Sequence, residues 1–131
     1  MIYGVGTDIV EICRIEDILN KNRRFLNKIF TEEEIVSLEE RNLRTEYIAG
    51  RFAAKEAVSK ALGTGFRGFN FKSIVVKSDE LGKPKVELQG VAKDIAEEKG
   101  EYIIHLSISH GRENAIAYAI WEVMENENRN I

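Results

Sequence analysis

The 131-residue sequence has a single cysteine, no long apolar run and no excess of basic residues. One cysteine, Cys13, excludes an internal disulfide. Because apolar Ile12 and Ile15 lie beside it, we expect a buried free thiol rather than a nucleophile. The apolar runs fall far short of the roughly 18 residues that cross a bilayer, so we expect no membrane-spanning helix and no membrane partner.

Targeting signals and a strong net charge are missing as well. The N-terminal stretch MIYGVGTDIV has no basic segment followed by an apolar run and a cleavage site, so no signal peptide is predicted and we expect a cytoplasmic protein. The net charge is only −3, which predicts no general attraction to nucleic acid. With 44% hydrophobic and 31% charged residues, the composition is typical of one globular domain.

Hydrophobic periodicity predicts a single α+β domain over residues 1–131, in the order β-α-α-α-β-β-α-β-β. The expected strands are 2–12, 71–78, 85–88, 102–109 and 114–123. The expected helices are 14–30, one that begins at Thr31, one that starts the segment 51–65 and ends at its glycines, and 91–99. In the first strand, Gly4 and Gly6 indicate close approaches of other backbone.

Local signals refine this order. Asn20 and Asn22 could divide the first helix in two. Thr31 and Glu34 form a capping-box pattern at the start of the second helix. The polar tail 126–131 is expected to fray.

The segment RFAAKEAVSKALGTG at 51–65 is apolar around most of a helical wheel, so this helix must be largely enclosed by protein. Glu56 and Lys60 share the one narrow polar gap, whereas Arg51 and Lys55 lie inside the apolar arc. Charges on an enclosed helix require partners.

Two carboxylates occupy unfavourable places. Asp8 lies in a strand-like segment and Glu56 on the enclosed helix, so both need compensation. A shared Mg²⁺ ion would supply it, because this ion binds carboxylate oxygens together with waters and substrate phosphates. Alternatively, Asp8 accepts a local hydrogen bond and Glu56 pairs with Lys60 as an i,i+4 couple worth about 0.3–0.5 kcal/mol.

A possible phosphate site follows at the end of the same helix. Lys60 and the amides of Gly63, Thr64 and Gly65 could hold phosphate oxygens. The helix dipole opposes an anion at this end, however, and a glycine helix stop explains the same residues.

The segment HLSISH places His105, Ser107 and Ser109 on one face of a strand, with His110 at its end. These groups could donate hydrogen bonds to a phosphate or ribose; alternatively, they form a solvated strand face. A serine hydrolase is disfavoured because no G-x-S-x-G elbow is present.

Basic residues cluster on the wheel of the first predicted helix, opposite its apolar face. They are Arg14, Lys21, Arg24 and Lys28. In a chain of net negative charge this stripe suggests an acidic partner, although such clusters are often simply solvated.

Four segments together resemble the holo-[acyl-carrier-protein] synthase family, the small bacterial 4'-phosphopantetheinyl transferases. They are GTDIVEICRI at 6–15, GRFAAKEAVSKALGTG at 50–65, GKP at 82–84 and HLSISH at 105–110. The resemblance implies a 4'-phosphopantetheinyl transferase-like fold. It also implies transfer of phosphopantetheine from coenzyme A to a serine of apo acyl carrier protein, which releases adenosine 3',5'-bisphosphate and supports fatty acid biosynthesis.

The resemblance also implies roles for individual residues. Asp8 and Glu56 match the family's magnesium ligands, and Lys60 matches the basic residue beside the diphosphate. Arg51 and His110 match contacts to the nucleotide end, including the 3'-phosphate. Arg14 matches a position in the helix that docks acidic carrier proteins. For Lys21 and Lys28, only the helical wheel supports a part in docking.

Known members of the family are trimers with coenzyme A sites between subunits, which implies a homotrimer in which Arg51 and Lys55 find partners across a subunit boundary.

Two alternative functions stay open: a magnesium-dependent nucleotide hydrolase using the same carboxylates, and a non-catalytic module that binds acidic helices. The sequence does not decide whether a metal-bound water or a carboxylate accepts the serine proton.

Overall fold

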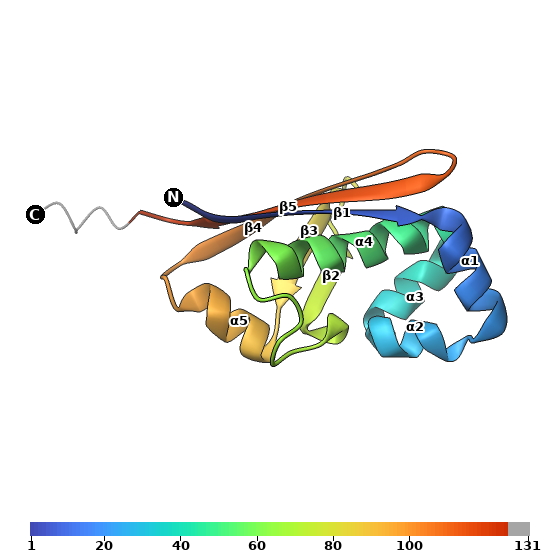
Figure 1. Ribbon diagram of the computed structural model, residues 1–131, viewed down its shortest axis with the longest axis horizontal. Helices are drawn as coiled ribbons and strands as arrows, with labels where there is room; N and C mark the ends of the chain where they lie inside the picture. The colour runs from blue at the N-terminus through green and yellow to red at the C-terminus, as the bar shows by residue number, and fades with distance from the viewer. Residues whose placement is uncertain (126–131) are drawn as a thin grey trace, which may run out of the picture.

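The computed structural model describes residues 1–125, so the predicted fraying of 126–131 lies outside the described part. The elements follow the predicted order, with one more helix and a short 3₁₀ turn (Figure 1). They are β1 (Ile2–Glu11), α1 (Ile12–Lys21), α2 (Arg24–Ile29), α3 (Glu32–Glu40), α4 (Thr45–Ala61), η1 (Phe71–Ser73), β2 (Ile74–Ser78), β3 (Pro84–Leu88), α5 (Gly90–Glu97), β4 (Tyr102–His110) and β5 (Asn114–Val123). The α+β prediction is confirmed.

An antiparallel sheet in the order β1-β5-β4 covers one side of α4, and β2 and β3 form a separate hairpin (Figure 1). The α4 helix lies very close to β1. A Cβ atom on Gly4 would stand 1.7 Å from the carbonyl oxygen of Ala61, and one on Gly6 would stand 1.9 Å from that of Ala57. Only glycine fits at both positions, so the predicted close backbone approaches are confirmed.

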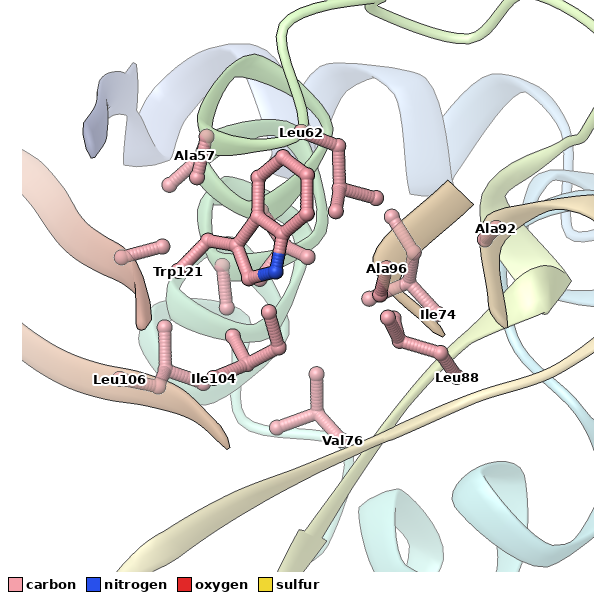
Figure 2. Close-up of a cluster of buried hydrophobic side chains, with 14 of the residues drawn as sticks. Ala57, Leu62, Ile74, Val76, Leu88, Ala92, Ala96, Ile104, Leu106 and Trp121 are labelled. Carbon is pink, nitrogen blue, oxygen red and sulfur yellow. The ribbon is translucent and has the colours of Figure 1, made fainter. Parts of the chain in front are cut away.

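Two hydrophobic clusters share α4 between them. The first packs the C-terminal half of α4 against the β2–β3 hairpin, α5 and the sheet, around Trp121 (Figure 2). The second packs the first half of α4 against α1, α2 and α3, with Phe30, Leu38 and Ile48 almost fully buried. As a result α4 is enclosed over most of its circumference, as its apolar wheel predicts.

The first predicted helix is divided at Asn22, the outcome that its asparagines left open, because Asn22 adopts an extended conformation and its Oδ1 accepts the Arg24 N–H at 3.0 Å. Two other local predictions need correction. The predicted strand at 71–78 begins only at Ile74, since Asn70 caps a 3₁₀ turn before it. Cys13 is exposed rather than buried: on α1 it lies about 100° from Ile12, away from the apolar face.

Lys55 finds its partner inside the same chain, contrary to the expectation of a partner across a subunit boundary. Its ammonium is fully buried, 2.7 Å from Glu34 Oε1 and 3.0 Å from the Phe71 carbonyl oxygen. Glu34 Oε1 also accepts the Thr31 N–H and Oε2 the Val76 N–H, so the capping box predicted at Thr31 is confirmed. Burial lowers the pKa of Lys55, and the Glu34 carboxylate partly offsets this effect.

We expect Lys55→Met to lower the free energy of unfolding by about 3–5 kcal/mol, because it leaves the Glu34 carboxylate buried without a cation. Urea unfolding measures the change. The matched control is Lys93→Met, which removes an exposed lysine paired with Glu97 at 3.8 Å and should change stability by about 0.5 kcal/mol or less. Equal effects of the two substitutions would contradict this account of the buried pair.

Candidate functional site

Asp8 and Glu56 come together where β1 crosses α4. Asp8 stands opposite Ala117 of β5, and its side chain lies on the α4 side of the sheet, only 11% exposed. Glu56 is half-buried on α4. Burial raises the pKa of Glu56, the negative charge of Asp8 raises it further, and the Lys60 ammonium acts in the opposite direction. The site therefore holds two neighbouring carboxylates with incomplete charge compensation.

Lys60 belongs to this group, but it does not form the alternative i,i+4 pair with Glu56. Its Nζ donates to Asp8 Oδ1 at 3.0 Å and to the Thr7 carbonyl oxygen at 3.0 Å. The Lys60 side chain is 52% exposed, so its ammonium also meets solvent. The lysine thus spans from α4 to β1 and supplies positive charge beside both carboxylates.

A cavity of about 400 Å³ opens beside the carboxylates, and both line it. Arg14 of α1 lines the same cavity, which brings one predicted docking residue next to the acidic pair. The other walls are largely apolar, with Ile9, Ile15, Ile18 and Phe52. Phe52 was not among the residues predicted for the site, although its position one turn before Glu56 on α4 was a usable signal.

The acidic pair suits a hard divalent cation. Within residues 1–125, no three His, Cys, Asp or Glu side chains are grouped so as to hold a metal ion. Mg²⁺ commonly takes only one or two protein carboxylates and completes its shell with waters and substrate phosphates. Asp8 and Glu56, with their excess negative charge, fit that pattern and are the residues that could hold the ion.

Arg51 lies on a different face of α4, about 140° around the helix from Glu56. One of its terminal nitrogens, Nη2, donates to the Tyr47 hydroxyl at 2.8 Å and to Ser78 Oγ at 2.7 Å. The residue is 7% exposed, and its buried Nη1 has no hydrogen-bond partner within residues 1–125. The structure thus separates Arg51 from the carboxylates of its own chain.

His110 ends β4, is exposed and lies near the start of α4. The pKa of Glu46 is lowered mainly by a hydrogen bond to backbone and by Arg44, with a smaller contribution from the nearby His110. Since Glu46 is in the first turn of α4, His110 lies toward the Arg51 half of this helix rather than the Glu56 half.

The glycine turn after α4 serves mainly as a helix stop. Gly63 and Gly65 adopt positive φ angles of 81° and 60°, and their N–H groups donate to the carbonyl oxygens of Lys60 and Ser59. The Thr64 hydroxyl donates to the Gly65 carbonyl oxygen at 3.0 Å. These bonds match the helix-stop alternative and leave few donors for a phosphate.

The remaining polar residues of HLSISH lie away from the carboxylates. His105, Ser107 and Ser109 alternate with buried Ile104 and Leu106, so they face the open side of the sheet. His105 Nε2 is 2.8 Å from Glu122 Oε1 on β5. The alternative of a solvated strand face therefore describes these three side chains.

The basic stripe does not lie on one helix, because the chain turns at Asn22 and Arg23. Arg14 and Lys21 belong to α1, whereas Arg24 and Lys28 belong to α2. All four are exposed, and none forms an ion pair with a residue of the described chain.

A model of the 4'-phosphopantetheinyl transferase superfamily, ACPS, matches residues 4–119. Among curated proteins, the chain is 59% identical over 130 residues to the holo-[acyl-carrier-protein] synthase of Clostridium novyi (strain NT), covering 99% of this chain and 94% of the relative. It is 58% identical over 123 residues to the corresponding synthase of Clostridium kluyveri, covering 94% and 92% of the two chains.

Solved structures show the same fold. A holo-[acyl-carrier-protein] synthase from Neisseria meningitidis matches with a TM-score of 0.86 and 39% identity, over 93% of this chain and 99% of that one. The Bacillus anthracis synthase, solved in complex with CoA (3',5'-ADP), matches with a TM-score of 0.78 and 42% identity, over 95% and 99% of the two chains. With these matches across nearly its whole length, the chain belongs to the holo-[acyl-carrier-protein] synthase family of 4'-phosphopantetheinyl transferases, as its motifs indicate.

Proposed function

We propose that this enzyme transfers 4'-phosphopantetheine from coenzyme A to a serine of apo acyl carrier protein, with Mg²⁺, releasing adenosine 3',5'-bisphosphate, in support of fatty acid biosynthesis. The observation that carries the proposal is the meeting of Asp8 and Glu56 at one cavity, with Lys60 bonded to Asp8 and an excess of negative charge that a cation would balance. Family membership and relatives solved with coenzyme A support the choice of substrate.

The proposed chemistry is phosphoryl transfer. The serine hydroxyl gives its proton to a water or a carboxylate of the site, and its oxygen forms a bond to the β-phosphorus. The bond from that phosphorus to the bridging diphosphate oxygen breaks, so adenosine 3',5'-bisphosphate leaves. Such transfers depend chiefly on positioning and charge neutralisation. Mg²⁺, when bound, would neutralise charge on the diphosphate; Asp8 and Glu56 would hold it, and Lys60 would donate to the phosphate oxygens.

Carrier docking is assigned to α1 and α2. Arg14 lines the cavity that contains the carboxylates, so a carboxylate near the carrier's serine could pair with it while the serine enters. The exposed cations Lys21, Arg24 and Lys28 extend the positive surface along the two helices. Apolar Ile18, 37% exposed, lies in the same cavity wall and gives the partner an apolar contact.

A homotrimer with sites between copies would explain two features of the fold. The outer face of the sheet exposes apolar side chains in register, among them Val5 at 50%, Ile9 at 62%, Ile116 at 44% and Tyr118 at 50%. Such a face favours coverage by another protein surface. Arg51 is turned away from Glu56, so a coenzyme A held by both would be shared by two copies.

In this arrangement the nucleotide end, including the 3'-phosphate, would meet Arg51 and His110 of one copy, and the diphosphate would meet Lys60 of the next. The buried, unpaired Nη1 of Arg51 supports an anion contact there. At the glycine turn, only the Thr64 amide would be left to donate to the ligand, because the Gly63 amide and the Thr64 hydroxyl already donate to carbonyl oxygens of the chain.

Within residues 1–125, no helix is both long and apolar enough to cross a membrane. We place the enzyme in the cytoplasm on the expectation from the sequence.

A nucleotide hydrolase using the same carboxylates would release phosphate without a carrier protein, and the following assay distinguishes this activity from phosphopantetheine transfer.

Mass spectrometry of apo carrier, incubated with the enzyme, coenzyme A and Mg²⁺, should show the gain of one phosphopantetheine group. Glu56→Gln should lower the transfer rate at least about 100-fold, because it removes a charged ligand at the reacting phosphate. Its melting temperature should stay close to that of the wild type. Glu97→Gln, which changes an exposed side chain of α5, is the matched control and should keep full activity. An active Glu56→Gln enzyme would remove the metal assignment.

Arg14→Glu should weaken carrier binding on the order of tenfold or more, since it reverses a charge that faces an acidic partner. Coenzyme A binding should change far less. Calorimetric titration of each ligand separately measures both affinities, and equal losses for carrier and coenzyme A would count against docking at α1.

Subunit sharing predicts complementation between two inactive variants. Arg51→Ala and Glu56→Gln, each inactive alone, should recover about one quarter of wild-type activity when co-expressed, because one interface in four joins an intact Arg51 to an intact Glu56. His110→Ala, which changes an exposed side chain, is the second partner if Arg51→Ala is unstable. No recovery in verified mixed oligomers would mean that each copy builds its own site.

A further inference from the structure

Lys60 already pairs with one oxygen of Asp8, the carboxylate to which the cation is assigned. Its ammonium is 3.0 Å from Asp8 Oδ1, and Asp8 is only 11% exposed while Lys60 is 52% exposed. A bound Mg²⁺ ion stands about 2.0–2.1 Å from a ligand oxygen, so an ammonium on the same oxygen and the ion would lie within a few ångströms of each other. Two such positive charges repel strongly. Lys60 and the ion therefore compete for this carboxylate.

The contacts of Lys60 allow it to leave. Its ammonium is held by only two groups of the described chain, Asp8 and the Thr7 carbonyl oxygen. The side chain is half-exposed and has a flexible four-carbon stem. Beyond it, the turn at Gly63 is open, because a Cβ atom there would meet nothing within 4 Å. An anion arriving from this side could take over the ammonium.

We propose that Lys60 acts as an internal substitute for the cation in the free enzyme and exchanges Asp8 for the diphosphate when coenzyme A binds. The inference rests on the proposed function, which assigns the cation to Asp8 and Glu56. In the free enzyme the lysine weakens cation binding. Once a diphosphate accepts the ammonium, Asp8 is released to the ion.

Cation and coenzyme A therefore bind cooperatively. By linkage, coenzyme A raises the affinity for the cation by the same factor as the cation raises the affinity for coenzyme A. The coupling arises because each ligand removes an obstacle to the other: the diphosphate withdraws the lysine, and the ion stabilises the diphosphate. The enzyme is therefore expected to bind the cation and coenzyme A together, with the cation already on the diphosphate.

The test is the binding of Mn²⁺, measured by electron paramagnetic resonance without coenzyme A. Lys60→Met should bind Mn²⁺ about two- to fivefold more tightly than the wild type, since the ion pair between half-exposed Lys60 and Asp8 no longer has to break. Coenzyme A should raise the Mn²⁺ affinity of the wild type by more than it raises that of the variant. Lys60→Gln serves as a second variant if Lys60→Met does not fold.

Arg14→Gln is the matched control. Arg14 lines the cavity beside the two carboxylates and carries the same charge as Lys60, but it has no ion pair with either carboxylate. Its replacement should change Mn²⁺ affinity clearly less than Lys60→Met. If both substitutions change the Mn²⁺ affinity equally, Lys60 acts only through its positive charge near the site. The proposed exchange at Asp8 is then overturned.

A Glu56→Gln enzyme separates this inference from the proposed function. If Glu56→Gln loses Mn²⁺ binding while Lys60→Met binds Mn²⁺ like the wild type, the cation assignment stands and the exchange at Asp8 is overturned. If Glu56→Gln keeps full Mn²⁺ affinity, the assignment of the cation fails and the inference fails with it.

Discussion

The close contact between α4 and β1 is the constraint on which the site depends. Gly4 and Gly6 present no side chain to the helix, so the carbonyl oxygens of Ala57 and Ala61 come within a distance that no Cβ atom would permit. This approach brings Asp8, two residues along the strand, beside Glu56 on the helix. A wider spacing, such as larger side chains would impose, would move the carboxylates apart and place Lys60 beyond the reach of Asp8.

The opposite flank of α4 is fixed by the buried pair of Lys55 and Glu34. This pair joins α4 to the start of α3. Through the Phe71 carbonyl oxygen and the Val76 N–H it also contacts η1 and β2. Because adjacent residues on a helix differ by about 100° in direction, holding Lys55 on one side sets the direction of Glu56 on the other. A buried pair is weak support for net stability, but its geometry is demanding, which suits a helix that must present a carboxylate at a set position.

The same helix divides the residues assigned to coenzyme A. Glu56 and Lys60 belong to the part of α4 that crosses β1, whereas Arg51 is bonded to Tyr47 and Ser78 on a different face. Under the proposed function, one chain would therefore contribute two half-sites to coenzyme A rather than one complete site. The exposed apolar face of the sheet offers a physical reason for copies to associate, as the proposed homotrimer requires.

The sequence by itself determined the α+β class, the enclosed helix with its charged residues, the glycines of close approach and the acidic pair, because these follow from local periodicity, propensity and motif. It left open what each charge would bind: Lys60 contacts Asp8 rather than Glu56, Lys55 is paired with Glu34, and Cys13 faces solvent. Those outcomes were decided only by the tertiary structure, because the partner of a charged residue depends on how β1, α3 and α4 pack. A helical wheel gives the direction of a side chain on its own helix, but not which element lies in that direction.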